Sequence, residues 1–332
     1  MRNPGRPTRR QFVAGSTGLA AALMLPLAHA QSGAKFPSKQ IRIIVPFPPG
    51  GLTDAYARLY GEQLTQQLGA SVLVENKSGA GAVIGIDTVV KSPPDGYTLL
   101  VTTTGTVMQN RVLYTKLPYN LDKDLTPIAI FPSGPLVVGV APNVPARNLR
   151  EFIEWAKGKD LSMGSYAPGS YPHMLADLFT RNYGLKIQVI HYRGEAPMWV
   201  DVASNQLQVA VGSYQAFNTV STRGVKPIGV TGNYRSPRLP ELLTLIEQGV
   251  TGTLVPLEGG LVLMAPSGTP EAVLQTLSAV VVKGAATAQA AKLRENFGIP
   301  NKPQNLADTR AEWDRAVPAW IKAAADLGVK LD

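Results

Sequence analysis

Short apolar runs alternate with longer amphipathic stretches along most of the chain. Ile41–Val45 is a nearly continuous apolar run that stops at Pro46, which is typical of a strand covered on both faces. In the stretch that follows, Tyr56, Leu59 and Leu64 recur at helical spacing. This alternation predicts an α/β fold with largely parallel sheets.

The same rhythm predicts the remaining elements. We expect further strands at 72–74, 97–102, 136–140, 161–164, 187–191, 208–211, 226–230 and 261–265. We expect helices at 149–157, 172–182, 195–204, 271–286, 288–297 and 306–327, after a first helix that Thr53 can cap and Gly69 can close. The chain has 332 residues, and the number of strands is too large for one compact sheet. The sequence therefore predicts two lobes.

The first thirty residues have the features of an export signal. Thr8–Val13 contains the pair Arg9-Arg10 in a twin-arginine pattern, an apolar stretch follows at Ala14–Leu27, and Ala28–Ala30 fits signal-peptidase cleavage. We therefore expect residues 1–30 to be a signal peptide of the twin-arginine (Tat) type, with the Sec route as the alternative. The expected mature chain is soluble in the periplasm, whose oxidising conditions a cysteine-free chain tolerates.

The net charge of +9 does not indicate a nucleic-acid partner. Several of the positive charges lie in the first ten residues, and the remaining Lys and Arg are scattered along the chain. A nucleic-acid surface needs a cluster or stripe of basic residues. We therefore expect no nucleic-acid partner.

The residue types that carry catalysis or bind metals are scarce. After residue 30 the chain has two histidines, His173 and His191, and no cysteine, so a zinc site cannot be assembled from them without carboxylates. Nucleophile-elbow and Walker A patterns are absent from the sequence. Gly79–Gly85 superficially resembles a dinucleotide loop, but the strand after it ends in Thr102–Thr104 with no acid to hold a ribose. We expect no catalytic residue, metal or cofactor, and a structural role is the simplest one for each histidine.

The segment 46–54 carries the clearest binding signal. It lies between the end of a predicted strand and the start of a predicted helix, where open α/β sheets bind ligands. Gly50 and Gly51 let a ligand approach their N–H groups, the helix start adds unpaired N–H groups, and Phe47 supplies an apolar wall. Because the charge of Asp54 opposes an anion, we expect its carboxylate to turn into the loop and accept backbone N–H bonds. The segment predicts a carboxylate site, with an ordinary strand–helix turn as the alternative.

A second loop of the same kind covers residues 165–173. It follows the predicted strand at 161–164 and ends at a helix start with a capping residue. Two such loops, one in each lobe, favour a ligand site more than either does alone.

Short phrases that match one protein family occur in the expected order over residues 36–328. They are Pro37–Phe47, Gly50-Gly51 with Asp54, Val74–Lys77, Gly79–Gly81, Pro94–Leu99, Leu113–Tyr119, His191–Gly194, Val230-Thr231, Arg235–Pro237, Leu239-Pro240 and Ala265–Pro270. On these phrases the chain resembles the extracytoplasmic solute receptors of tripartite tricarboxylate transporters, the Bug receptor family. The resemblance implies a Venus-flytrap fold of two α/β lobes that close on a small carboxylate, held by backbone amides and ordered waters. It implies a first lobe of 36–134 plus 258–332 and a second lobe of 135–257.

Carried over residue by residue, the resemblance also implies a set of ligand contacts. Those of the first lobe would be Phe47, Pro49, Gly50, Gly51, Asp54, Thr103 and Thr104. Those of the second lobe would be Ser165, Gly169, Ser170, His173, Tyr192, Gly194, Ala196 and Ser213. The chain departs from the family pattern at Tyr166–Pro168 and at Gly212-Ser213, where the distal end of the ligand would lie. Ligand identity is therefore the property that the resemblance transfers least.

The function implied is capture of a small carboxylate in the periplasm and its delivery to the membrane permease of a tripartite tricarboxylate transporter. The alternatives are an enzyme acting on a small organic acid and an orphan or sensory receptor. Turnover needs a positioned general acid or base, whereas capture and release needs only a hinge and a preformed site. Because the chain lacks recognisable catalytic machinery, we expect a binding protein without cofactor. We also expect it to be a monomer.

Overall fold

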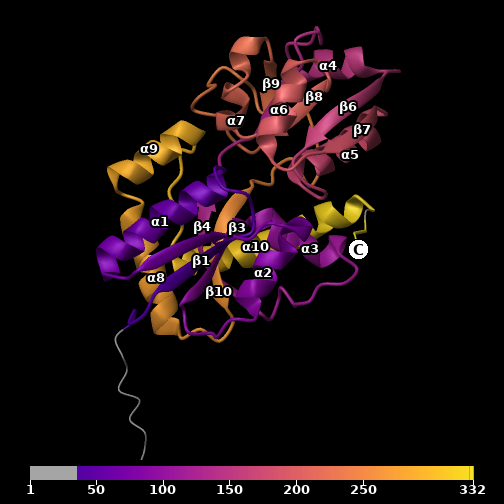
Figure 1. The fold of residues 1–332 in the computed structure, drawn as a ribbon. Helices are drawn as coiled ribbons and strands as arrows, with labels where there is room; N and C mark the ends of the chain where they lie inside the picture. Colours follow the sequence, from indigo (N-terminus) through magenta and orange to yellow (C-terminus); the bar gives the residue numbers. More distant parts are fainter. Residues whose placement is uncertain (1–35, 329, 332) are drawn as a thin grey trace, which may run out of the picture. The chain divides into compact units, whose positions relative to one another are not determined.

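The computed structural model describes residues 36–328 and 330–331, and the strands within them form two five-stranded sheets (Figure 1). The predicted signal peptide lies outside these residues. Within them, no helix has the length and apolar character needed to cross a membrane.

The first sheet combines strands from both ends of the chain. Its order is β2-β1-β3-β10-β4. The strands are β1 (Ile41–Val45), β2 (Val72–Asn76), β3 (Thr98–Thr103), β4 (Leu125–Pro132) and β10 (Gly260–Pro266). Its helices are α1 (Leu52–Leu68), α2 (Val83–Val90), α3 (Thr104–Leu113), α8 (Glu271–Gly284), α9 (Ala288–Phe297) and α10 (Leu306–Asp326), with a short 3-10 helix at Ala80–Ala82.

The second sheet comes from one continuous stretch of chain. Its order is β7-β6-β8-β5-β9. The strands are β5 (Val137–Val140), β6 (Asp160–Ser165), β7 (Lys186–His191), β8 (Val209–Gly212) and β9 (Lys226–Val230). The helices are α4 (Leu149–Ala156), α5 (Tyr171–Tyr183), α6 (Glu195–Ala203) and α7 (Tyr214–Asn218), with a 3-10 helix at Ser221–Arg223.

Each sheet is mixed, and the two share one arrangement of strand directions. In the first, β1 runs parallel to β2 and β3, and β10 runs antiparallel to β3 and β4. In the second, β6 runs parallel to β7 and β8, and β5 runs antiparallel to β8 and β9. Four strands of each sheet therefore point the same way, and the reversed strand lies next to one edge. This confirms a two-lobed α/β fold with mostly parallel sheets.

The apolar runs occupy the interior as their pattern predicts. Ile43 and Ile44 of β1 are both almost fully buried on opposite faces of the strand. Ile43 lies against α1, where a β-carbon on Gly61 would come within 3.7 Å of it, and Ile44 shares a core cluster with Ile86 of α2. Helices therefore cover both faces of this strand, which explains its continuous hydrophobicity.

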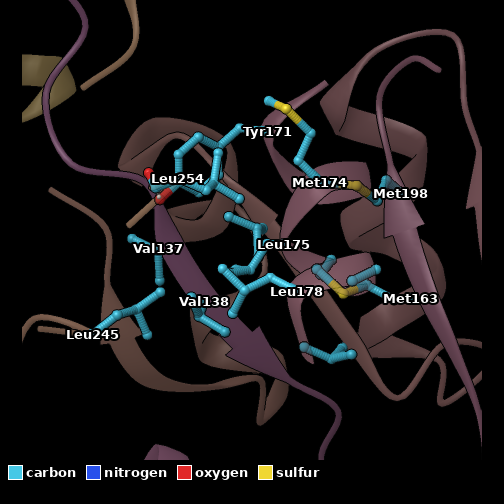
Figure 2. Packing of buried hydrophobic residues seen from close by; sticks show 14 of the residues in the cluster. Val137, Val138, Met163, Tyr171, Met174, Leu175, Leu178, Met198, Leu245 and Leu254 are labelled. Carbon is cyan, nitrogen blue, oxygen red and sulfur yellow. Dashed lines mark hydrogen bonds between the residues drawn. The ribbon is translucent and has the colours of Figure 1, made fainter. Parts of the chain in front are cut away.

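The core of the second lobe includes residues of β5, β6 and α5. Figure 2 shows Val138, Met163 and Leu175 in the same apolar cluster, and all three are fully buried. Figure 2 also shows Leu245 and Leu254 at the side of this cluster; they come from the irregular segment that follows β9. The irregular segment is thereby part of the second lobe's core.

The start of the first helix differs from the prediction. Gly51, with an extended backbone (φ −84°, ψ 174°), is the residue before α1, and no side chain caps this helix. Thr53 lies inside the first turn and is buried. The prediction that Thr53 caps the helix is therefore wrong, because the glycine adopts the extended conformation one residue before Leu52.

Candidate functional site

The first group of predicted site residues lies at the carboxyl ends of β1 and β3. These strands are parallel neighbours, with Ile43 opposite Leu99, so the segments that follow them leave the same edge of the sheet. Segment 46–51 leads from β1 into α1, and Thr103 ends β3. Phe47 is half-buried against the core cluster, whereas Pro49, Gly50 and Gly51 are exposed.

The two glycines of this loop differ in their backbone requirements. Gly50 has a φ of +94°, which favours glycine, whereas Gly51 has an ordinary φ of −84°. A β-carbon on either residue would meet no atom within 4 Å. The space beside both residues is therefore open, and the first amides of α1 beyond Gly51 have no side-chain cap.

Asp54 turns back into the loop, as the sequence predicts. Its Oδ2 accepts a hydrogen bond from the backbone N–H of Gly50 at 3.1 Å, and the residue is only 5% exposed. Burial raises the pKa of Asp54, but hydrogen bonds from Arg58, Asn76 and Gly50 outweigh it and hold the pKa below its ordinary value. The carboxylate is therefore ionised, and it engages the N–H of Gly50.

Two residues that the sequence reasoning missed fix this arrangement. Arg58 donates from Nε to Asp54 Oδ2 and from a terminal nitrogen to Oδ1, both at 3.0 Å. Asn76 donates from Nδ2 to Asp54 Oδ1 at 3.0 Å and to the carbonyl oxygen of Phe47 at 3.1 Å. The helical spacing of Asp54 and Arg58 is a signal for the first contact. The second depends on strand register, which pairs Asn76 with Val45 at the start of the loop.

Thr103 and Thr104 are engaged by their own backbone surroundings. The hydroxyl oxygen of Thr103 accepts from the N–H of Thr106 at 3.2 Å and so caps α3. The hydroxyl of Thr104 is buried, donates to the carbonyl oxygen of Gly260 and accepts from its N–H. Thr104 therefore ties the start of α3 to β10.

The second group lies at the carboxyl ends of β6, β7 and β8, which are parallel neighbours. The hydroxyl groups of Ser165 and Ser170 are 2.8 Å apart, and that of Ser165 donates to the carbonyl oxygen of Ala167, also at 2.8 Å. With its hydroxyl used in this way, Ser170 precedes α5 without capping it. At the start of α5 the backbone N–H of Tyr171 is engaged by the hydroxyl of Tyr166, and Pro172 has no N–H.

His173 closes the same loop through a backbone contact. Its Nδ1 accepts a hydrogen bond from the N–H of Gly169 at 3.0 Å, so the proton of the neutral ring is on Nε2. Burial, together with nearby His191, lowers the pKa of His173 to about 4. The two rings are nearly perpendicular, with centroids 4.9 Å apart. His173 therefore holds the loop through Nδ1, and its Nε2–H is a hydrogen-bond donor.

Gly169 cannot be replaced without movement. Its φ is +71°, and a β-carbon there would collide with Leu113 of α3. The loop at 165–173 therefore packs closely against the end of α3.

The remaining predicted residues surround the starts of α6 and α7. Tyr192 donates its N–H to the carbonyl oxygen of Ser165 at 2.8 Å, which joins the loops after β6 and β7. Gly194, with a φ of +105°, precedes α6 without a side-chain cap, and Ala196 is exposed in its first turn. Ser213 caps α7 and donates from its N–H and its hydroxyl to Glu195, a residue that the sequence reasoning missed.

Three of the helices that follow predicted site residues begin without a side-chain cap. Among the described helices, α1, α5 and α6 begin without a side-chain cap, as do α2 and α8, whereas α3, α4, α7, α9 and α10 have one. Uncapped N-terminal amides are free to bind an anion. No hydrogen bond among the residues described here joins the first group to the second.

The described residues offer no group of three or more His, Cys, Asp or Glu side chains that could hold a metal ion. What the site does offer is backbone N–H groups beside open space at the carboxyl ends of parallel strands. Fold and site together define the class of two-lobed α/β binding proteins.

The family described as the tripartite tricarboxylate transporter family receptor matches residues 56–311, so the chain belongs to that family. Among curated relatives, Protein BugT of Bordetella pertussis (strain Tohama I) is 30% identical over 312 residues, which are 92% of this chain and 94% of BugT. These matches confirm the resemblance to the Bug receptors.

Two solved structures extend the comparison to the fold. R. palustris Rpa4515 with adipate is 29% identical with a TM-score of 0.80, covering 89% of this chain and 99% of Rpa4515. The periplasmic binding protein BugD is 27% identical with a TM-score of 0.75, covering 89% of this chain and 99% of BugD. Both structures are similar to this chain over almost the whole of its described part.

Proposed function

We propose that this protein is a periplasmic receptor that captures a small carboxylate between its two lobes and delivers it to the membrane permease of a tripartite tricarboxylate transporter. The observation that carries the proposal is the set of uncapped helix N-termini at α1, α5 and α6, which follow the loops predicted to bind ligand. The adipate in the structure of Rpa4515 supports a carboxylate as the ligand class.

The proposed lobes are residues 36–134 with 258–332, and residues 135–257. The supporting observation is that β10 lies between β3 and β4 in the first sheet, whereas the second sheet uses only β5 to β9. The chain would then cross between lobes near residues 134 and 257. Two crossovers of this kind are suited to a hinge.

The proposed anchor for the ligand carboxylate is the backbone of the first loop. Because Asp54 takes the N–H of Gly50, the N–H of Gly51 and the first amides of α1 are the groups that would hold the anion. A buried anion must be richly hydrogen-bonded or paired, and charge-assisted bonds to backbone amides meet this need. The second lobe would complete the site with the starts of α5 and α6.

Binding without turnover is the simpler role for these residues. A general acid or base has to reach the reacting group, and the Nδ1 of His173 already accepts from Gly169 while Asp54 is held by Arg58. We propose a monomeric, non-catalytic receptor exported by a twin-arginine signal peptide. An enzyme for a small organic acid and an orphan or sensory receptor are the competing functions.

A thermal-shift screen of the mature protein against mono-, di- and tricarboxylates tests the proposal. A ligand that binds only the folded state raises the melting temperature, so at least one carboxylate should raise it, and by more at higher concentration. Uncharged amide analogues of the hits serve as controls. If no carboxylate shifts the transition, or if the amide analogues shift it equally, the receptor hypothesis fails. Chemical conversion of a hit on incubation would favour the enzyme.

A further inference from the structure

A carboxylate that lies among the proposed ligand contacts has a fixed position. Glu195 is the first residue of α6 and stands between Gly194 and Ala196. Its Oε2 accepts hydrogen bonds from the N–H of Ser213 at 2.9 Å and from the hydroxyl of Ser213 at 2.6 Å. Two bonds to one oxygen orient the carboxylate at the carboxyl ends of β7 and β8, which flank β6.

This carboxylate has no cationic partner in the part of the chain that the structure describes. Burial raises the pKa of Glu195, and only the two hydrogen bonds from Ser213 act against it. Asp54 in the first lobe contrasts with it, because Arg58 neutralises that carboxylate. The second lobe therefore presents a carboxyl group without a neutralising cation, whereas the first lobe does not.

Gly212 has no side chain, which leaves space for the side chain of Glu195. A β-carbon at Gly212 would come within 3.0 Å of Glu195 Oε2 and within 2.9 Å of the indole Nε1 of Trp199. Trp199 is fully buried, and among the described residues its Nε1 has no hydrogen-bond partner. The pKa of Tyr166 is raised by burial and by the charge of Glu195, so its hydroxyl stays protonated near the same carboxylate. Glu195 is thus the carboxyl-bearing member of a cluster of polar groups at this position.

The free oxygen of this carboxylate determines what can bind opposite it. Among the described residues, Glu195 Oε1 accepts no hydrogen bond, and the side chain is only half-buried. An ionised carboxylate only accepts hydrogen bonds, and a second carboxylate placed against it in a site of low dielectric is disfavoured. A hydroxyl or ammonium group at the same place would donate to it.

We propose that Glu195 is a specificity-determining residue that makes the site prefer carboxylates with a hydrogen-bond donor at their other end over dicarboxylates of the same length. The inference rests on the proposed function, since it assumes that a ligand carboxylate is anchored at the first loop. It concerns the distal end of the ligand, where the chain departs from the family pattern at Tyr166 and Gly212.

Matched series of ligands test this preference. Titration calorimetry would compare hexanoate, adipate, 6-hydroxyhexanoate and 6-aminohexanoate, and then the four-carbon equivalents, on the wild-type protein and on Glu195→Gln. Glutamine keeps an oxygen to accept the bonds from Ser213 but removes the charge. Glu154→Gln, a change at an exposed carboxylate of α4 in the same lobe, is the matched control.

We expect the wild-type protein to bind a hydroxyl- or amino-ended member at least about tenfold more tightly than the matching dicarboxylate. Glu195→Gln should abolish or reverse this ratio, and Glu154→Gln should keep it. The ratio of these two affinities distinguishes a specificity role from a structural one. If the role of Glu195 were merely structural, the substitution would weaken the binding of all ligands in parallel.

Two results would overturn the inference and leave the receptor function intact. One is tighter or equal binding of the dicarboxylate by the wild-type protein, which is decisive even if the glutamine variant does not fold. The other is a parallel loss for all ligands in Glu195→Gln. If no member of either series and no other carboxylate binds, the proposed function itself fails and the inference falls with it.

Discussion

The N–H of Gly50 donates to the carboxylate of Asp54 across 3.1 Å, within the loop predicted to hold the ligand. The carboxylate of Asp54 therefore already accepts a hydrogen bond from one of the backbone N–H groups that a ligand could have used. Because Arg58 neutralises Asp54, the negative charge does not extend into the site. The open amides begin one residue later, at Gly51.

Replacing Asp54 tests whether this contact shapes the loop. In Asp54→Asn the amide nitrogen would face the N–H of Gly50 or the guanidinium of Arg58, so one donor is left without an acceptor. We expect a loss of about 1–2 kcal/mol in the free energy of unfolding, measured by urea denaturation, and weaker binding of any carboxylate ligand. Asp314→Asn, at an exposed position, should change neither quantity. Unchanged stability and affinity in Asp54→Asn would contradict a shaping role.

Gly51→Val tests the amide anchor directly. The φ of Gly51 is ordinary and a β-carbon there meets no atom within 4 Å, so the fold should tolerate the change. A branched side chain in that open space would keep the ligand from the amides. We expect a loss in affinity of at least about 2 kcal/mol, or roughly thirtyfold, with an unchanged circular dichroism spectrum. The rival anchor is the exposed cation Arg193; if Arg193→Ala abolishes binding while Gly51→Val leaves it nearly unchanged, the amide anchor is wrong.

Ligand binding should bring the two lobes together. The proposed contacts come from the loops of two separate sheets, and the proposed crossovers between the lobes lie near residues 134 and 257. Small-angle X-ray scattering should give a smaller radius of gyration at saturating ligand than without ligand. A ligand that calorimetry shows to be bound, with no change in the radius, would rule out the hinge.

The predicted export signal lies in residues outside the described structure. If the pair Arg9-Arg10 directs the protein to the twin-arginine pathway, changing both to Lys should abolish its accumulation in the periplasm. Fractionation followed by immunoblotting measures this. Normal accumulation of the Lys variant would leave the Sec route as the explanation.

The local pattern of the sequence predicted the elements whose own residues form apolar, buried faces. It located β1 because the run is apolar on both faces, but it missed β4, which contains Pro127 and Pro132. Both prolines are tolerated because β4 is an edge strand whose pairing with β10 shifts register beside Pro127. A proline that the local sequence marks as a strand breaker is thus compatible with an irregular edge strand. Only the order of strands in the sheet shows that β4 lies at an edge.

The candidate site likewise contains residues that the sequence predicted and residues that it did not. Asp54 could be predicted to turn into its loop, because its charge conflicts with an anion at the helix start. Asn76 and Glu195 could not be found in this way, because their partners, Asp54 and Ser213, lie 22 and 18 residues away in sequence. Strand register and the packing of α6 bring them together, and neither is encoded in a local pattern.

The contact between His173 and Gly169 gives the stability of the protein a dependence on pH. Nδ1 can accept the N–H of Gly169 only while the ring is neutral, and the pKa of His173 in the folded protein is about 4, below the ordinary value of 6.5. Between these two values the unfolded chain binds more protons than the folded one at this residue. The free energy of unfolding should therefore decrease as the pH falls from about 6.5 to about 4, by up to about 3 kcal/mol from this residue. Urea denaturation at a series of pH values measures the decrease.

Two asparagine variants show whether His173 is its source. In His173→Asn the side-chain oxygen can still accept from Gly169, but the residue does not titrate, so most of the decrease should disappear. His191→Asn is the matched comparison, since burial also lowers the pKa of His191 while no hydrogen bond among the described residues holds its ring. His191→Asn should remove a smaller part of the decrease in the free energy of unfolding. If His173→Asn keeps the full pH dependence of the wild-type protein, protonation of His173 does not limit its stability in acid.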